Sequence, residues 1–200
     1  MYIIKRLSAM HRDKVIAHFI GLDESSRYSR FCSHIKDDSL RHYVTQMDFE
    51  HDGIFGLFNE NLNIIGVGEC VFSQNLDENG KFQAEVGFSV TPQFQGQGLG
   101  NKLMKRVIQF AHANGTEVLI MYCLSTNQKS MHLAKKYGLK TQTSYGETKA
   151  IIDMPEVSPL NSQYQENLDE MFANIELSAV EHQHLWQNHL ENMNKWIRVM

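Results

Sequence analysis

The sequence has few prolines and cysteines and lacks a strong excess of charge of either sign. Only 3 of its 200 residues are Pro, and with 42% hydrophobic and 21% charged residues the chain can bury a full globular core. The cysteines, Cys32, Cys70 and Cys123, are an odd number at wide spacings, which argues against a disulfide framework and indicates a reducing compartment. The formal net charge of −4, without a basic stripe, gives little support to nucleic-acid binding.

Long hydrophobic runs are also missing. No apolar run reaches the length needed to span a membrane, and residues 1–6 lack the hydrophobic core of a signal peptide. We therefore expect a soluble cytoplasmic protein with no membrane partner. Because Pro155, Ser158 and Pro159 interrupt the pattern, we expect a domain at residues 1–154 and a helical extension at residues 155–200.

The hydrophobic pattern of residues 1–154 predicts an α/β (α+β) fold with a mixed sheet of about seven strands. The expected strands are residues 2–6, 54–59, 64–73, 82–90, 118–124, 140–145 and 148–154. Four helices are expected to begin near Ser8, Asp38, Asn101 and Asn127. Residues 21–31 are expected to form a connection between the first two of these helices.

The extension carries apolar residues at helical spacing, without any Gly or Pro after Pro159. They are Leu168, Met171, Phe172 and Ile175, followed by Trp186, Leu190, Met193 and Ile197. Residues 178–181 read Ser-Ala-Val-Glu, a capping-box pattern that predicts the start of a second helix. Two interpretations stay open: these helices pack back on the domain, or they form a homodimer surface or a lid.

The most informative segment is residues 95–100, which read Gln-Gly-Gln-Gly-Leu-Gly. It lies between a predicted strand and a predicted amphipathic helix. Such an elbow gathers backbone N–H groups at the positive end of a helix dipole, which suits a phosphate or diphosphate. The glycine spacing does not fit the dinucleotide fingerprint, and no Gly-Lys-Ser/Thr follows that would make it a P-loop.

The order Gln-x-x-Gly-x-Gly after a strand resembles motif A of the GNAT N-acetyltransferases, and residues 127–139 resemble their motif B. The resemblance covers about residues 1–154 and implies the mostly antiparallel GNAT sheet flanked by helices. Residues 22–31, Ala84-Glu85 and Ala134 are also similar, more weakly, to the acetyltransferase domain of Pat-type bacterial protein-lysine acetyltransferases. The family implies acetyl-CoA as cosubstrate and an amine acceptor, either a protein lysine or a small amine.

The resemblance also implies which residues bind the cofactor. The loop amides would hold the pyrophosphate, and the end of the preceding strand would pair with the pantetheine arm. Asn127 would contact the cofactor, act as a helix N-cap, or do both. The implied cofactor-binding residues are Phe88, Ser89, Val90, Gln95, Gly96, Gln97, Gly98, Leu99, Gly100 and Asn127.

Acetyl transfer to an amine needs a base, because a lysine-like amine is protonated at neutral pH. Glu85 is the predicted base, since it begins the strand before the elbow and shares a face with Gly87 and Ser89. The alternative is a partly exposed strand carboxylate without a catalytic role, and Glu69 is the reserve base. Many family members carry a Tyr that protonates the leaving thiolate where this chain has Ala134, so the general acid is unassigned.

Other residues leave further alternatives. Arg27, Tyr28 and Arg30 either face the acceptor or pack against the sheet. His182, His184 and His189 lack a completing cysteine or carboxylate, so we predict no metal site. Ala134 and the helical tail also motivate a second function, a sensor or interaction protein that binds acyl-CoA without turnover.

Overall fold

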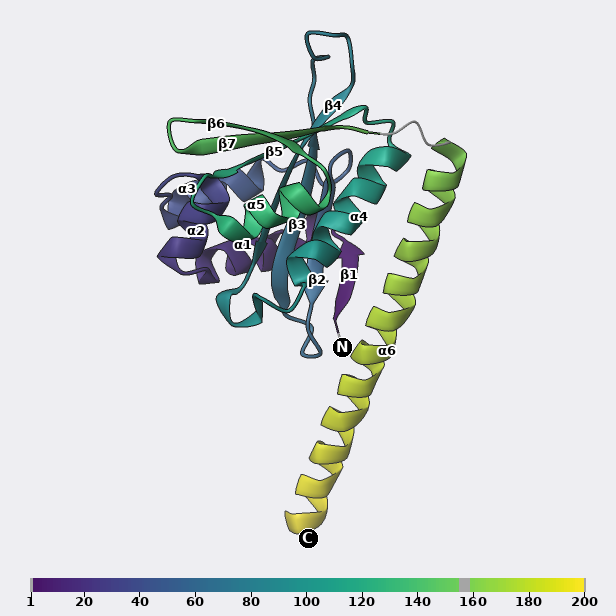
Figure 1. Ribbon diagram of the computed structural model, residues 1–200. Helices are drawn as coiled ribbons and strands as arrows, with labels where there is room; N and C mark the ends of the chain where they lie inside the picture. The colour runs from purple at the N-terminus through teal and green to yellow at the C-terminus, as the bar shows by residue number, and fades with distance from the viewer. Residues whose placement is uncertain (1, 155–158, 200) are drawn as a thin grey trace.

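The computed structural model describes residues 2–154 and 159–199 and shows one sheet with helices on both faces (Figure 1). The strands are β1 (Ile3–Arg6), β2 (Gly53–Phe58), β3 (Ile64–Phe72), β4 (Gln83–Val90), β5 (Val118–Leu124), β6 (Lys140–Ser144) and β7 (Glu147–Asp153). The helices are α1 (Arg12–Gly21), α2 (Glu24–Phe31), α3 (Asp37–Thr45), α4 (Leu99–Ala113), α5 (Gln128–Lys136) and α6 (Pro159–Val199), with short 3-10 turns at η1 (Ala9–His11) and η2 (Pro92–Phe94).

The seven strands follow the order β1-β2-β3-β4-β5-β7-β6. Every neighbouring pair is antiparallel except β4 and β5, which are parallel. The prediction of a mixed, mostly antiparallel sheet flanked by helices is therefore confirmed. Within the described ranges, no helix is long and apolar enough to cross a membrane.

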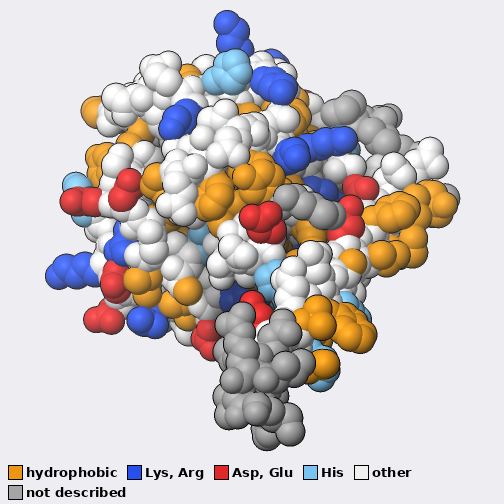
Figure 2. All heavy atoms as spheres, turned by 90° about the horizontal axis from the view of Figure 1, so that it is seen from below, with side chains coloured by type: hydrophobic (Ala, Val, Ile, Leu, Met, Phe, Trp, Pro, Cys, Tyr) orange, Lys and Arg blue, Asp and Glu red, His pale blue; other side chains and the backbone are white. Residues whose placement is uncertain are grey.

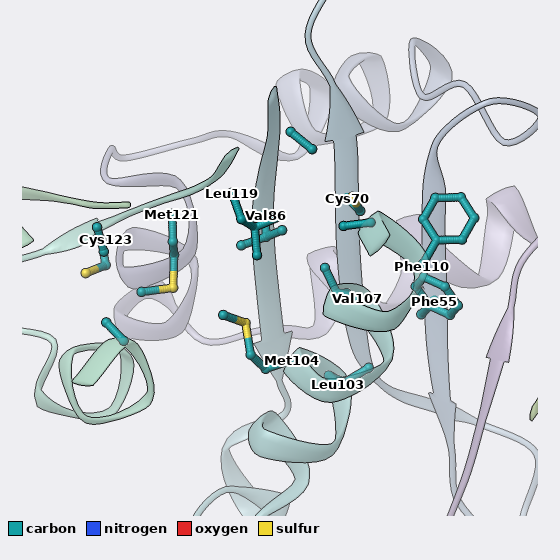
Figure 3. Packing of buried hydrophobic residues seen from close by; sticks show 14 of the residues in the cluster. Phe55, Cys70, Val86, Leu103, Met104, Val107, Phe110, Leu119, Met121 and Cys123 are labelled. Atoms are coloured by element: carbon teal, nitrogen blue, oxygen red, sulfur yellow. The ribbon is translucent and has the colours of Figure 1, made fainter. Parts of the chain in front are cut away.

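Each face of the sheet is covered by its own apolar cluster. On one face α4 places Leu103, Val107 and Phe110 against the strands, at the spacing of a single helical stripe (Figure 3). On the other face α1 and α3 contribute Phe19 and Leu40 to a second cluster. The sheet is thus fixed between two helical layers, and the point where β4 meets β5 lies between them.

Helix α2 corrects the prediction that residues 21–31 are a connection. Asp23 caps the helix by accepting a hydrogen bond from the Ser26 N–H at 2.7 Å. The Arg27 side chain donates to the carbonyls of Ile20 and Leu22 at the end of α1. No α2 side chain is fully buried, so the segment lacks the apolar period that identified the other helices.

Helix α6 corrects the prediction that a second helix begins at Ser178. The helix runs without interruption through this pattern, because no Gly or Pro breaks its hydrogen-bond ladder there. Its first half packs along α4 and β1, and its second half extends past the sheet (Figure 1). The predicted boundary at residues 155–158 lies outside the described residues.

Ion pairs and hydrogen bonds join the first half of α6 to α4 and β1. Arg106 of α4, only 7% exposed, binds both carboxylate oxygens of Glu166. The Gln109 amide donates to Asp169 at 3.1 Å, and the Arg6 backbone N–H donates to Glu170 at 3.1 Å. The interpretation that the tail packs back on the domain is therefore correct for this half of the helix.

Candidate active site

The parallel pairing of β4 with β5 stops part-way along both strands. Residues 83–86 of β4 pair with residues 118–121 of β5, and the pairing goes no further in the described chain. Beyond that point β4 still pairs with β3, and β5 still pairs with β7. The two strands therefore separate after residue 86 of β4 and residue 121 of β5, and we call the space between them the notch. Phe88, Ser89 and Val90 lie along its β4 edge, where backbone groups facing β5 can pair with an extended ligand.

The glycine loop follows directly after this edge. Gly96 and Gly98 have φ of +77° and +76°, a conformation that L side chains rarely adopt. No protein atom lies within 4 Å of a Cβ placed on either residue, so the loop backbone is open to close approach. Gly98 is the N-cap of α4, so Leu99 and Gly100 begin the helix whose N–H groups face the loop.

Side chains around the loop hold it in place and add a positive charge. The Gln95 amide donates to the Val90 carbonyl at 2.8 Å, and the Gln97 amide oxygen accepts from the Tyr2 hydroxyl at 3.0 Å. Lys129 Nζ donates to the Gln95 side-chain oxygen at 2.6 Å. An ammonium group beside a helix N-terminus favours an anion. Lys129 is a site residue that the sequence pattern did not indicate, although it lies in the first turn of the segment predicted to be motif B.

Two carboxylates lie near the notch in different surroundings. Glu69 on β3 is 1% exposed, and its oxygens accept from Arg30 Nη2 at 2.6 Å and from the Tyr43 hydroxyl. Burial, followed by the Glu69 charge, raises the pKa of Tyr43, so this hydroxyl remains a donor at neutral pH. Glu69, the reserve base, is therefore held in a buried ion pair.

Glu85, the second carboxylate, is not held in such an ion pair in the described chain. It is exposed on β4, on the face that also carries Gly87, which pairs in register with Glu69. Partial burial raises the pKa of Glu85; Arg30 opposes this shift and the Glu69 charge adds to it. A partly exposed carboxylate with a raised pKa, one residue before the point where β4 and β5 stop pairing, is a candidate general base.

The family model of the acetyltransferase (GNAT) family matches residues 20–139, more than half of the chain. The chain belongs to the acetyltransferase (GNAT) family. The matched residues include the notch, the glycine loop and the segment predicted to be motif B. The family membership predicted from the two motifs is confirmed.

Three solved structures share this fold with the chain at low sequence identity. The GNAT domain of S. lividans PAT is 17% identical with a TM-score of 0.62, covering 76% of this chain and 89% of that one. The protein yncA from Salmonella typhimurium, solved with its cofactor acetyl-CoA, is 17% identical with a TM-score of 0.61, covering 79% and 96%. A ribosomal-protein-alanine N-acetyltransferase from Brucella melitensis is 13% identical with a TM-score of 0.60, covering 76% and 99%.

The motif B residues of this GNAT chain have structural partners. The Asn127 side chain accepts from the Ser130 N–H at 3.1 Å, so it caps α5, whereas its contact with a cofactor stays a prediction. Ala134 is fully buried, and the Tyr137 hydroxyl donates to the Asn101 side chain at 3.1 Å. Tyr137 is therefore directed toward α4, and the general acid remains unassigned.

The arginines of residues 22–31 bind other residues of the domain. Arg30 lies beneath Gly87 and binds Glu69, and Arg27 joins α1 to Asp37 at 2.6 Å. Tyr28, 37% exposed, lies against the His34 ring. The interpretation that these residues pack against the sheet is thus correct for Arg30, whereas Arg27 contacts α1 and α3 instead.

Proposed function

We propose that this GNAT protein transfers an acetyl group from acetyl-CoA to an amine, with Glu85 as the general base. The observation that carries the proposal is the difference between two neighbouring carboxylates. Glu69 is held in an ion pair with Arg30, and within the described residues Glu85 is not. At neutral pH only about one in 10³ lysine-like amines is unprotonated, so a base must remove a proton before or during attack. Glu85 can do this directly or through a water molecule.

Acetyl-CoA supplies an acetyl group activated as a thioester, and the residues present fit such a molecule. The open glycine backbone at Gly96 and Gly98, with Lys129 beside it, suits a diphosphate. The free β4 edge at residues 88–90 suits the amides of a pantetheine arm. In the transfer an N–C bond forms and the C–S bond breaks. A thiol pKa near 8.5 makes the thiolate a fair leaving group without a dedicated acid.

The acceptor belongs to one of two classes, a protein lysine or a small amine. The cytoplasmic location expected from the sequence is part of the same proposal, and the free state of Cys32, Cys70 and Cys123 supports it. The homodimer expected from the tail is a separate proposal, and the exposed apolar side chains of α6 support it.

The alternative function is a sensor that binds acyl-CoA without turnover, and the buried Ala134 at the usual Tyr position favours it. Thiol release from acetyl-CoA, measured with a panel of small amines and lysine peptides, separates the two. Turnover that falls about 10²–10⁴-fold in Glu85→Gln, with acetyl-CoA affinity unchanged, supports the enzyme. Glu78→Gln, in the exposed turn between β3 and β4, is the matched control. Binding without turnover on any amine would support the sensor.

A further inference from the structure

Helix α6 carries apolar side chains on two opposite faces. Ala173 and Leu177, 5% and 8% exposed, face the domain. Six large apolar residues, 48–66% exposed, make up what we call the outward stripe: Phe172, Ile175, Leu185, Trp186, Leu190 and Met193. At about 100° per residue, Ile175, Trp186 and Met193 lie half a turn away from Ala173 and Leu177. The domain therefore uses one face of the helix and leaves the other uncovered.

The spacing of the outward stripe is that of helix pairing. Phe172, Ala179, Trp186 and Met193 recur every seven residues, with Ile175, His182 and His189 between them. The a position is thus apolar over three repeats, which extend about 32 Å along the helix, whereas of the d positions only Ile175 is apolar and His182 and His189 are polar. Knobs-into-holes packing against another helix is the contact that such a pattern serves. A single face that only packs on a globular domain does not need it.

Charge argues for a second copy as the other helix. Residues 159–193 contain no Lys or Arg and six acidic residues, whereas helices that bind membrane surfaces are rich in Lys and Arg. The e and g positions of this repeat, 171, 176, 178, 183, 185 and 190, carry one charge, Glu176, and two of them, Leu185 and Leu190, belong to the stripe itself. Two copies can therefore meet along this stripe with little like-charge repulsion.

The exposed area agrees with a dimer of ordinary size. With each of the six side chains about half exposed, the stripe offers roughly 600 Å² per copy before its flanks are counted. Stable interfaces bury about 800 Å² per partner. Figure 2 shows hydrophobic side chains exposed on the right-hand part of the face seen from below, the side on which α6 lies in Figure 1.

The C-terminal half of α6 also lacks support from its own domain. The His184 ring donates to the Glu60 carbonyl at 2.8 Å, and the described chain gives no hydrogen bond to the domain after that residue. An isolated helix of about 15 residues is marginal in water. A partner helix would stabilise the projecting segment seen in Figure 1.

We propose that α6 pairs with α6 of a second copy through the outward stripe, giving a homodimer with the two acetyltransferase domains on its outer sides. The proposal is independent of acetyl transfer, because none of these residues belongs to the notch or the glycine loop.

Sedimentation equilibrium on the full chain, from about 1 to 100 µM, tests the proposal. The wild-type chain should have the mass of a dimer, and Trp186→Glu or Met193→Glu should weaken association at least about 30-fold. Both substitutions lie beyond the contact with the domain, and circular dichroism with acetyl-CoA titration checks that the variants are folded. Asn188→Glu, on the opposite side of the helix, is the matched control and should remain a dimer.

Three results would overturn the proposal. One is a wild-type chain that is monomeric at 100 µM. Another is a dimer that both stripe variants leave intact, since its interface would then lie elsewhere. The third is a monomer that co-sediments with vesicles of phosphatidylcholine and phosphatidylserine, because the stripe would then face lipid.

Discussion

The guanidinium of Arg30 occupies the space that a side chain on Gly87 would need. A Cβ on Gly87 would lie 2.5 Å from Arg30 Nη2, which is shorter than real Cβ contacts. The absence of a side chain at this position of β4 thus permits the buried pair between Arg30 and Glu69. Glycine is therefore needed at position 87 because the ion pair of Arg30 with Glu69 occupies the space, and not because the strand itself needs a glycine.

The substitution Gly87→Ala should therefore displace Arg30 and leave Glu69 without its ionic partner, with only the Tyr43 hydroxyl still donating to it. Removal of one member of a buried pair typically costs about 3–5 kcal/mol, and we expect a loss in the free energy of unfolding near the lower value. Urea denaturation measures it. Gly21→Ala is the control, because no atom lies within 4 Å of a Cβ there, and it should change stability by less than about 1 kcal/mol. Equal effects of the two variants would contradict this account of Gly87.

The pH dependence of activity should report the charge of Glu69. The wild-type rate should rise with pH as Glu85 ionises, with a midpoint above the ordinary Glu value, because burial and the Glu69 charge both raise the pKa of Glu85. In Glu69→Gln the Glu69 charge is gone and Arg30 still acts, so the pKa of Glu85 falls and the acid limb of kcat/KM moves to lower pH. Tyr43→Phe, which removes a hydrogen bond and keeps both charges, is the control. An unmoved acid limb in a folded Glu69→Gln variant would contradict the assignment of Glu85.

Replacement of a loop glycine should weaken acetyl-CoA binding more than it weakens the fold. Gly98→Ala forces a side chain into the left-handed region, at a cost of about 1–2 kcal/mol, and places a methyl group where the loop backbone is open. Gly80→Ala imposes the same strain in the turn between β3 and β4, where φ is +77°. Calorimetric titration should show at least about tenfold weaker binding for Gly98→Ala only. Equal affinities in the two variants would place the diphosphate elsewhere.

Stability should fall in mild acid because of His18. Burial lowers the pKa of His18 to about 4, and its ring bonds the Ser89 hydroxyl at 2.8 Å. Between pH 6.5 and 4 the unfolded chain binds a proton at this residue and the folded chain does not, so stability falls as pH falls, by up to about 3 kcal/mol. The unfolding free energy of His18→Gln should depend less on pH in this interval. His42→Gln, which removes an exposed ring on α3, controls for the loss of a histidine as such.

The sequence predicted the elements whose hydrophobic residues recur at a regular spacing or that are bounded by glycines. Helix α4 was predictable because Leu103, Val107 and Phe110 form one stripe directly after the glycine loop. Helix α2 was not, because polar contacts such as Asp23 with Ser26 hold it. The ion pair between Arg30 and Glu69 could not be predicted from the sequence either, because the two residues are 39 positions apart and meet only when α2 packs on the sheet. The ammonium of Lys129 likewise reaches the loop only through tertiary folding.

Binding of acetyl-CoA where β4 and β5 part, as proposed above, would link the lifetime of this protein to the supply of a metabolite. A molecule that fills the notch binds the folded chain and not the unfolded one, so it shifts the folding equilibrium by mass action. At a concentration 100 times its dissociation constant, the shift is about 2.7 kcal/mol. A cell that runs short of the thioester would therefore expose more of this chain to its proteases, and the amount of enzyme would follow the amount of its donor.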